Sequence, residues 1–196
     1  MIFDSEMNKI ASFGMYPSNF AFRVFSVNVG EYDTYPDVTD QTLAQGFSAR
    51  LGSLSFYTLA ECRWITIEIW VAEPSDEICL LPETVRAILV PFSVFEAGTK
   101  IADIIGLVEG QVHLTRGEYA LVFELKLQDD VEYLNSAQYQ ENVADCSTQE
   151  WCRLTFYPRE NSVQPEILRL DAWSEPTYPI DGYAGLNPTY PLLMEI

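Results

Sequence analysis

Carboxylates are the most numerous groups in this 196-residue sequence that could take part in chemistry, with 29 acidic residues against 11 basic ones and a formal charge of -18. Several of them lie close together in two clusters: Asp33, Asp37 and Asp40, and Asp129, Asp130 and Glu132. Clustered oxygen ligands are typical of calcium sites, and two carboxylates suffice for glycoside hydrolysis. Neither cluster matches the glycine-containing calcium loop, and pairs are inevitable among so many acids. We therefore interpret both clusters as solvated acidic loops and expect no metal site.

The sequence has few of the other groups on which enzymes rely. His113 is the only histidine, which rules out any mechanism that needs two imidazoles. It lies between Val112 and Leu114 in a short expected strand, where a surface or hydrogen-bonded structural role is the simplest interpretation. There is no G-x-S-x-G elbow, no phosphate-binding glycine loop and no H-E-x-x-H motif. We expect a non-catalytic protein that needs no cofactor.

The cysteines do not form a recognisable metal or redox motif. Their spacing matches neither a paired zinc ribbon nor a C-x-x-C pair: Cys62, Cys79, Cys146 and Cys152. We expect them to be small core hydrophobes with reduced thiols. The amino terminus lacks the features of a signal peptide, and no stretch approaches the roughly 18 apolar residues of a membrane span. These features predict a soluble, cytoplasmic protein.

The charge balance restricts the kind of partner. Binding to nucleic acid depends on cations that neutralise phosphates, so an acidic protein is poorly suited to direct contact with nucleic acid or with anionic lipid. A strongly negative field instead speeds association with a positively charged partner, such as a nucleic-acid-binding protein. The alternative is that the acids serve solubility alone.

Acidic residues of the first cluster lead into a junction between a helix and a strand. Thr39 or Asp40 can cap a short helix over Gln41–Gln45, and Gly46 can end it in the left-handed conformation. Beyond Gly52 the pattern becomes that of a strand. Its apolar and polar sides alternate: Leu54 and Phe56 on one face, Ser53, Ser55 and Tyr57 on the other.

The clearest strand, WITIEIWV, begins at Trp64. Ile65, Ile67 and Ile69 form an inward row, while Trp64 and Trp70 lie on the outward face. Two tryptophans on an outward face predict either a second covering layer or an exposed aromatic patch for a partner.

Alternating patterns predict further short strands along the chain. The stretch from Phe20 to Val29 changes register, which indicates a bulge or a strand buried on both faces. Pro91 predicts an edge strand or a bulge, because proline cannot donate to the ladder. The remaining expected strands are 84–95, 101–105, 111–114 and 119–127, followed by a hairpin of 152–157 with 166–172.

These elements predict a single domain. Residues 1–18 read as a loosely attached lead-in, residues 19–175 as the domain, and residues 176–196 as an extended tail rich in proline and tyrosine. The connection over residues 128–150 has little apolar periodicity and is expected to be a mobile loop. Seven to nine short strands with scarcely any helix predict an all-β fold, a single-domain antiparallel β-sandwich with one short helix and long loops.

Three segments resemble a known family. The run TDQTLAQGFSARLGSLSF, Thr39 to Phe56, is similar to the T-D-x-x-x-x-x-G-[FY]-[SA]-A-x-x-G-x-[IL]-S-F segment of the competence protein J family. VPFSV, Val90 to Val94, and GEYALVFEL, Gly117 to Leu125, resemble that family's V-P-F-x-V and G-[DE]-Y-x-L strands in the same order. The resemblance covers roughly residues 20 to 128. The long 128–150 connection and the proline-rich tail depart from it.

The resemblance implies a protein that inhibits a DNA-entry nuclease by binding it tightly. Such a nuclease grips DNA in a cationic groove around a metal, which an acidic protein can occupy by imitating phosphates. Charge placement nominates the loops 31–40, 73–77 and 129–132, with neighbouring tyrosines as anchors. The candidate partner-binding residues are Glu31, Asp33, Asp37, Asp40, Asp129, Asp130 and Glu132.

Other functions remain open at the level of sequence. An immunity protein for another secreted toxin or nuclease would differ only in its cognate enzyme. A calcium-dependent β-sandwich binding module would be stabilised by calcium. An enzyme would lose turnover when one carboxylate pair is replaced, and a structural subunit would co-purify at fixed stoichiometry.

Overall fold

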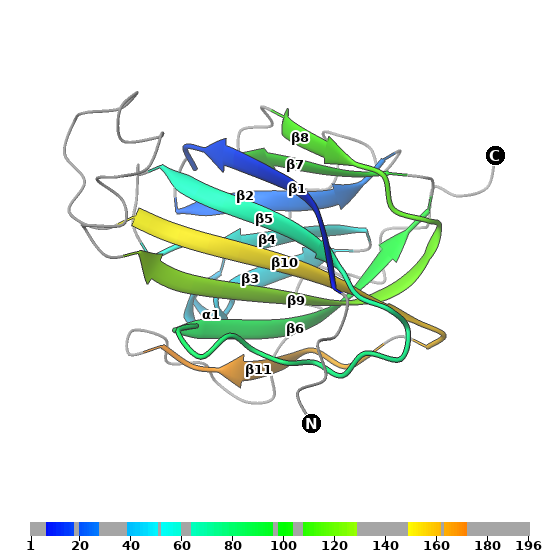
Figure 1. Cartoon of the computed structure of the whole chain (residues 1–196). Helices are drawn as coiled ribbons and strands as arrows, with labels where there is room; N and C mark the ends of the chain where they lie inside the picture. Colours follow the sequence, from blue (N-terminus) through cyan, green and yellow to red (C-terminus); the bar gives the residue numbers. More distant parts are fainter. Residues whose placement is uncertain are drawn as a thin grey trace.

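Two β-sheets packed face to face make up the computed structural model of the chain (Figure 1). The structure describes residues 7–17, 20–27, 39–50, 52–59, 64–95, 98–103, 108–128, 149–161 and 163–171. These residues form strands almost throughout, with one short helix, which confirms the predicted all-β sandwich. No helix in these ranges has the length and apolar character needed to cross a membrane.

The first sheet, sheet A, has six strands in the order β1-β5-β10-β9-β6-β11. Their bounds are Asn8–Met15 (β1), Ile65–Val71 (β5), Arg86–Val94 (β6), Gly117–Gln128 (β9), Gln149–Arg159 (β10) and Glu166–Arg169 (β11).

The second sheet, sheet B, has five strands in the order β3-β4-β2-β7-β8. Their bounds are Ala21–Ser26 (β2), Phe47–Arg50 (β3), Ser53–Tyr57 (β4), Thr99–Asp103 (β7) and Val108–Val112 (β8).

Alternation along the strands places one apolar row of each sheet in the core between them. Ile65, Ile67 and Ile69 are fully buried there, as the sequence pattern predicts. Phe56 of sheet B stacks on Phe123 of sheet A, with 4.6 Å between ring centroids, so aromatic packing fixes how the two sheets meet. All six residues of β2 are buried, which confirms the expectation of a strand buried on both faces.

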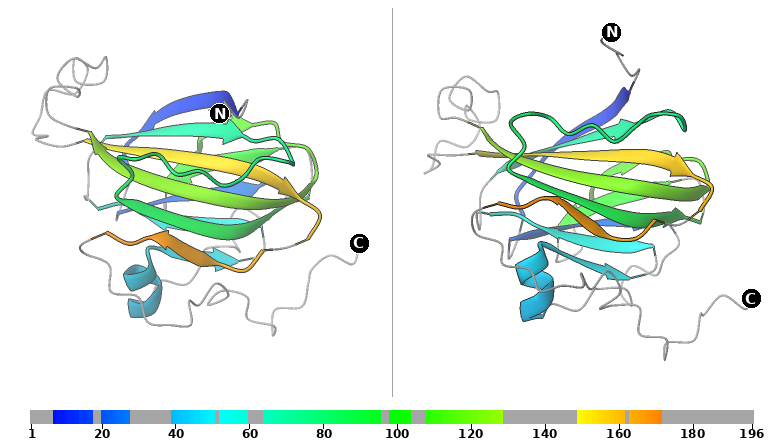
Figure 2. Two further views of the ribbon diagram at one scale, coloured as in Figure 1. Left: turned by 60° about the horizontal axis from the view of Figure 1, so that its bottom comes forward. Right: turned by 90° about the horizontal axis from the view of Figure 1, so that it is seen from below.

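The helix cap and the turn at Gly46 form as predicted, but the first strand begins at Phe47 rather than beyond Gly52: β3 follows the helix directly and pairs with β4 in a hairpin. Thr39 caps α1 (Asp40–Gln45), with its hydroxyl oxygen accepting from the Thr42 amide at 3.1 Å. Gly46 follows with φ of 85°, and a Cβ there would lie 3.1 Å from the Ile88 side chain. Glycine is therefore needed both for the left-handed turn and for close packing of the junction on β6. Figure 2 shows α1 beside β3, at one edge of the sandwich.

The segment of residues 72–85, which joins β5 to β6, returns over the outer face of sheet A (Figures 1 and 2). Ile78 and Leu80 of this segment pack against a second apolar cluster that includes Leu89, Val122 and Tyr157. Part of the outer face is thus a second, smaller core, and this segment is the covering layer there.

Three strand predictions need correction. Asn8–Met15 is not part of a loose lead-in, since it pairs with β5, where its buried Met15 joins the core. β10 and β11 do not form the predicted hairpin, because β5 and β9 occupy both edges of β10 and β11 pairs with β6 instead. The sandwich is not wholly antiparallel, since β10 runs parallel to β5; the other pairings among the described strands are antiparallel.

Pro91 lies in β6, which is an inner strand of sheet A by order. β11 pairs with β6 only as far as Leu89, so the ladder on that side stops before the proline. The prediction of an edge at Pro91 is therefore correct locally. Of the expected loop over 128–150, Gln128, Gln149 and Glu150 belong to β9 and β10, and residues 129–148 lie outside the described residues, as does the tail over 176–196.

Candidate functional site

Among the predicted partner-binding acids, Asp40 is the one that the structure describes. It is the exposed first residue of α1, where a negative charge interacts favourably with the helix dipole. The carboxylate therefore supports the helix and is also open to solvent. The other predicted residues lie outside the described ranges: Glu31, Asp33, Asp37, Asp129, Asp130 and Glu132.

The acidic turn over residues 73–77 is held in one conformation by its own side chains and by β10. The Asp76 carboxylate accepts a hydrogen bond from the Glu73 amide at 2.9 Å, and the Asp76 amide donates back to the Glu73 carbonyl at 3.0 Å. Arg159 donates to the carbonyls of Pro74 and Asp76 at 3.3 and 3.4 Å. A fixed turn of this kind presents its charges without a large ordering cost on binding.

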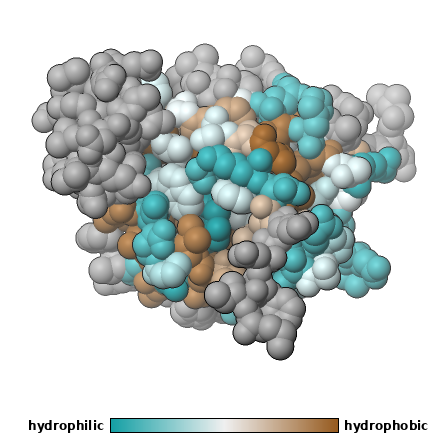
Figure 3. Space-filling model, in the orientation of Figure 1, coloured by the Kyte–Doolittle hydropathy of each residue, from teal (hydrophilic) through white to brown (hydrophobic). Residues whose placement is uncertain are grey.

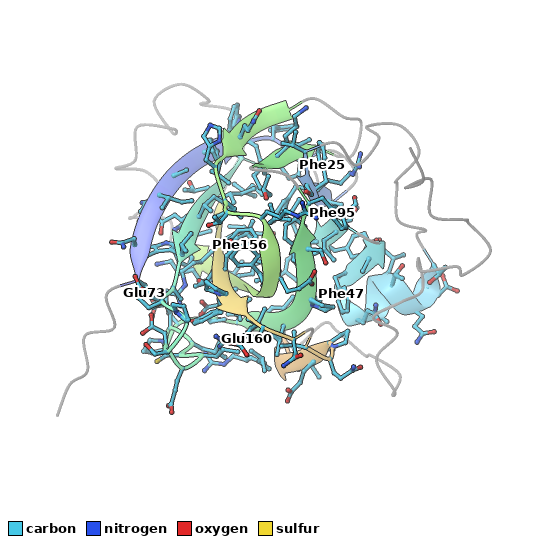
Figure 4. The ribbon with its side chains drawn as sticks, turned by 90° about the vertical axis from the view of Figure 1, so that its right-hand side faces the viewer. Phe25, Phe47, Glu73, Phe95, Phe156 and Glu160 are labelled. Atoms are coloured by element: carbon cyan, nitrogen blue, oxygen red, sulfur yellow. The ribbon has the colours of Figure 1, made fainter. Side chains whose placement is uncertain are left out.

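Exposed carboxylates gather around this turn. Glu73 and Glu77 are exposed, as is Glu160, which follows β10. Figure 4 shows Glu73 and Glu160 at the rim of the molecule, away from the core that surrounds Phe156. Charge nominated three loops, and the 73–77 turn is the one that the structure describes in full. This turn is a preformed acidic surface.

Two other acids are buried in ion pairs and are structural. Glu124 of β9 binds Arg153 of β10 and also accepts hydrogen bonds from the Leu81 amide and the Thr84 hydroxyl, both at 2.8 Å. Asp171 binds the Nε of Arg86 at 2.6 Å. Such pairs are held together because separating them would leave a buried charge uncompensated. These carboxylates are unavailable to a partner.

Sequence reasoning missed both pairs. Their partners are far apart in the chain, so no spacing pattern reveals them. The available signal was weak: Glu124 and Arg153 are charges at outward positions of otherwise apolar strands.

Charge is unevenly distributed along the sequence. The described ranges contain every basic residue apart from Arg63, but only about half of the acidic ones. Lys9 pairs with Glu68, and Lys126 lies 3.7 Å from Glu83. The described body is thus close to neutral, and most of the acidic excess belongs to residues outside the described ranges.

Four aromatic residues lie on the outer face of sheet A: Tyr16, Trp64, Trp70 and Trp151. We call this set the aromatic face. The tryptophans are partly exposed, and Tyr16 is 46% exposed. Of the two explanations for outward tryptophans, the covering layer holds for the surface around Val122 and Tyr157, but it leaves the aromatic face partly open.

The remaining reactive groups are dispersed. His113 is exposed just after β8. Cys152 is buried in the core, and this burial raises the pKa of its thiol well above the usual range, with a further rise from the Glu150 carboxylate. Cys79 is exposed, so the prediction of a core position is wrong for it, because it lies in the 72–85 segment. Cys62 and Cys146 lie outside the described ranges.

No group of three or more histidine, cysteine or acidic side chains within the described ranges is arranged to hold a metal ion. The carboxylates that do converge with other groups accept hydrogen bonds from arginine, amide and hydroxyl donors.

Known proteins resemble this chain in sequence and in fold. The model of the family Competence protein J (ComJ) matches residues 20–157. The solved structure of ComJ from Bacillus subtilis, described as an inhibitor of the DNA degrading activity of NucA, has a TM-score of 0.55 at 17% identity and covers 76% of this chain and 98% of that chain.

A second structure, described as crocagin biosynthetic gene J, has a TM-score of 0.49 at 10% identity, covering 79% of this chain and 98% of that chain, which is too weak a likeness to support an argument. No curated protein matches the sequence. Because the family model spans the two sheets from β2 to β10, this chain belongs to the competence protein J family.

Proposed function

We propose that this protein is a non-catalytic inhibitor that binds a DNA-degrading nuclease and blocks it. The observation that carries the proposal is membership of the competence protein J family, matched over residues 20–157. The structural relative from Bacillus subtilis is an inhibitor of the DNA degrading activity of NucA. The cognate partner of this chain is accordingly a nuclease of the DNA-entry type, with a cationic surface that receives DNA.

Charge supplies the physical mechanism. A groove that binds DNA neutralises phosphates with lysine and arginine, and closely spaced carboxylates can compete for the same cations. With a formal charge of -18, the chain attracts such a surface from a distance. A near-neutral sandwich with acidic connections can occupy the groove without large repulsion inside its own core.

The acidic turn at 73–77 is one contact that we assign to this mechanism. Glu73 and Glu77 are exposed, while Arg159 and Asp76 hold the turn in place. The same role for Asp40 and for the acids near positions 31–37 and 129–132 rests on their charge in the sequence.

The proposal is tested by mixing the purified protein with the DNA-entry-type nuclease encoded by the same organism. We expect a complex on size-exclusion chromatography with light scattering, and loss of DNA degradation by the nuclease in that complex. A nuclease of unrelated fold serves as the control and should keep its activity. Absence of a complex at micromolar concentrations and low salt would refute the proposal.

A further inference from the structure

The aromatic face is built from three neighbouring strands of sheet A. Tyr16, directly after β1, meets Trp64, directly before β5, edge to face, with 6.0 Å between ring centroids. Trp151 of β10 lies directly beside Thr66 of β5 in the parallel ladder. Trp70 stands further along the same face of β5, since even-numbered residues of that strand point outward. One face thus gathers three of the four tryptophans of the chain.

Two of these rings are held by their neighbours. The indole Nε1 of Trp70 donates to Glu68 at 3.1 Å. The ammonium of Lys126 lies 4.8 Å from the centroid of the Trp151 ring, in a cation–π contact. Thr66 is paired with Gly14, which has no side chain, so the surface next to Thr66 is recessed on the β1 side. The result is a preorganised surface, which loses little entropy on binding.

The 72–85 segment covers a different part of sheet A. Its apolar side chains pack against residues of β6, β9 and β10 such as Leu89 and Val122. Figure 3 looks onto the outer face of sheet A and, where grey atoms do not cover it, shows apolar residues as separate spots among polar ones. Tryptophan and tyrosine are the residues that most often supply binding energy on mixed surfaces of this kind.

Charge identifies the occupant that suits the face. Its own cations are neutralised, because Lys9 pairs with Glu68 and Lys126 lies near Glu83. The connection from β9 to β10 leaves and returns at the paired residues Gln128 and Gln149, next to Trp151. In sequence, that connection contains acids and no basic residue: Asp129, Asp130, Glu132, Glu141 and Asp145.

Aromatic rings on a protein of large negative charge favour arginine and lysine, which can stack on the rings while the field of the protein attracts their charge. Lys126 on Trp151 is an example of this contact within the chain itself. Single-stranded nucleic acid also stacks on aromatic rings, but it needs a positive groove, and the cations here are already paired.

We propose that the aromatic face is the anchor by which this protein holds its partner, a cationic surface of the nuclease rich in arginine and lysine. This inference rests on the proposed inhibitor function and specifies the surface that performs it. The formal charge of -18 adds long-range steering, and the rings supply contact area that charge alone lacks.

Binding of variants to the cognate nuclease tests the anchor. Tyr16→Ala and Trp151→Ala should each raise the dissociation constant about tenfold or more, as hot-spot truncations do. Leu170→Ala is the matched control, because Leu170 is 49% exposed just after β11, at the edge of sheet A opposite β1, and its loss should leave affinity unchanged. Melting temperatures of all variants confirm that they are folded.

A charge pair at the centre of the face provides a second readout that does not depend on truncating a ring. Thr66→Lys places a cation between Trp64 and Trp151 and should raise the dissociation constant about tenfold. Thr66→Glu introduces a side chain of similar size with the opposite charge, and this variant should bind at least as tightly as the wild type.

The outcomes are distinct. If the wild type neither binds nor inhibits the nuclease, the proposed function fails and the anchor fails with it. If the wild type inhibits while Tyr16→Ala, Trp151→Ala and Thr66→Lys bind as tightly as Leu170→Ala, the inhibitor function stands and the anchor is overturned. Binding of wild type to a single-stranded oligonucleotide that is lost in Tyr16→Ala would also overturn it.

Discussion

Arg86 connects sheet A to sheet B and also binds a residue that follows β11. From β6 in sheet A it donates to the carbonyl of Tyr57 in sheet B at 2.7 Å and to the Asp171 carboxylate beyond β11. A guanidinium is suited to this position, because its planar fork serves several acceptors at once. Arg86 thus organises the junction that packs against Gly46.

Asp171→Asn should destabilise the protein by about 3–5 kcal/mol, because it leaves the Arg86 cation buried without its counter-charge. Urea unfolding followed by tyrosine and tryptophan fluorescence measures the change. Glu68→Gln is the comparison: its partner Lys9 is exposed, so the loss should stay within about 1 kcal/mol. Equal losses in the two variants would show that burial adds nothing to the Arg86 pair.

Cys152 makes stability depend on pH in the alkaline range. Its folded pKa is raised by burial and by Glu150, with Arg86 acting in the opposite direction. In the unfolded chain the thiol loses its proton near pH ~8.5, so above that pH the unfolded state binds fewer protons than the folded state. The contribution is therefore fully present below pH ~8.5 and is lost as pH rises toward the folded pKa.

We expect the free energy of unfolding to fall between pH 8 and 10, and Cys152→Ala to make that fall shallower by up to about 1.4 kcal/mol per pH unit. Tyr157, whose pKa is also raised by burial, should still contribute at the upper end. Leu154→Ala, at a buried non-titrating position of the same strand, should lower stability and keep the wild-type slope. An unchanged slope in Cys152→Ala would contradict this account.

At the scale of elements, the 72–85 segment depends on hydrogen bonds to charged side chains as well as on apolar contact. Glu124 binds its Leu81 amide and Thr84 hydroxyl, while Arg169 donates to three of its carbonyls, at distances of 2.6 to 3.2 Å. Irregular backbone over a sheet must have its polar groups satisfied in this way. The segment is accordingly part of the folded body.

Glu124→Gln should release this segment, because the new amide opposes the Arg153 guanidinium and one carboxylate oxygen is lost. We expect a destabilisation of about 3–5 kcal/mol and faster amide exchange over residues 78–85, measured by hydrogen–deuterium exchange with mass spectrometry. Glu118→Gln, on the same strand with a single bond to Ser93, should leave that segment protected. Similar exchange in both variants would show that apolar packing alone holds it.

Local patterns predicted some elements completely and others not at all. The cap at Thr39, the turn at Gly46 and the alternation of β5 depend on neighbours in sequence, and the structure confirms them. The parallel pairing of β10 with β5 depends on residues far apart in the chain, which no local pattern encodes. β1 was missed because its alternation is weak: it is an edge strand with several exposed residues.

The candidate site shows the same division. Charge in the sequence correctly singled out the 73–77 turn as an acidic surface, since exposure follows from composition. It could not show that Asp76 closes the turn or that Arg159 holds it. Nor could it bring Tyr16 and Trp151 to Trp64 at the start of β5, because that requires the strand order of sheet A.

At the scale of the whole molecule, the protein combines a near-neutral sandwich with acidic connecting ranges. Long-range attraction from those acids should raise the rate of association with a cationic nuclease, and salt should screen it. We expect the association rate constant to fall about tenfold or more between 50 mM and 500 mM salt, with a smaller change in the dissociation rate, measured by stopped-flow or surface plasmon resonance. A rate that is independent of salt would show that the charge serves solubility alone.

The most direct measurement is a titration of nuclease activity. The DNA-entry-type nuclease of the same organism degrades a DNA duplex while this protein is added in increasing amounts at low salt. The inhibitor account predicts that degradation falls in proportion to the protein added and stops once the nuclease is saturated. Undiminished degradation in the presence of micromolar excess of this protein would contradict it.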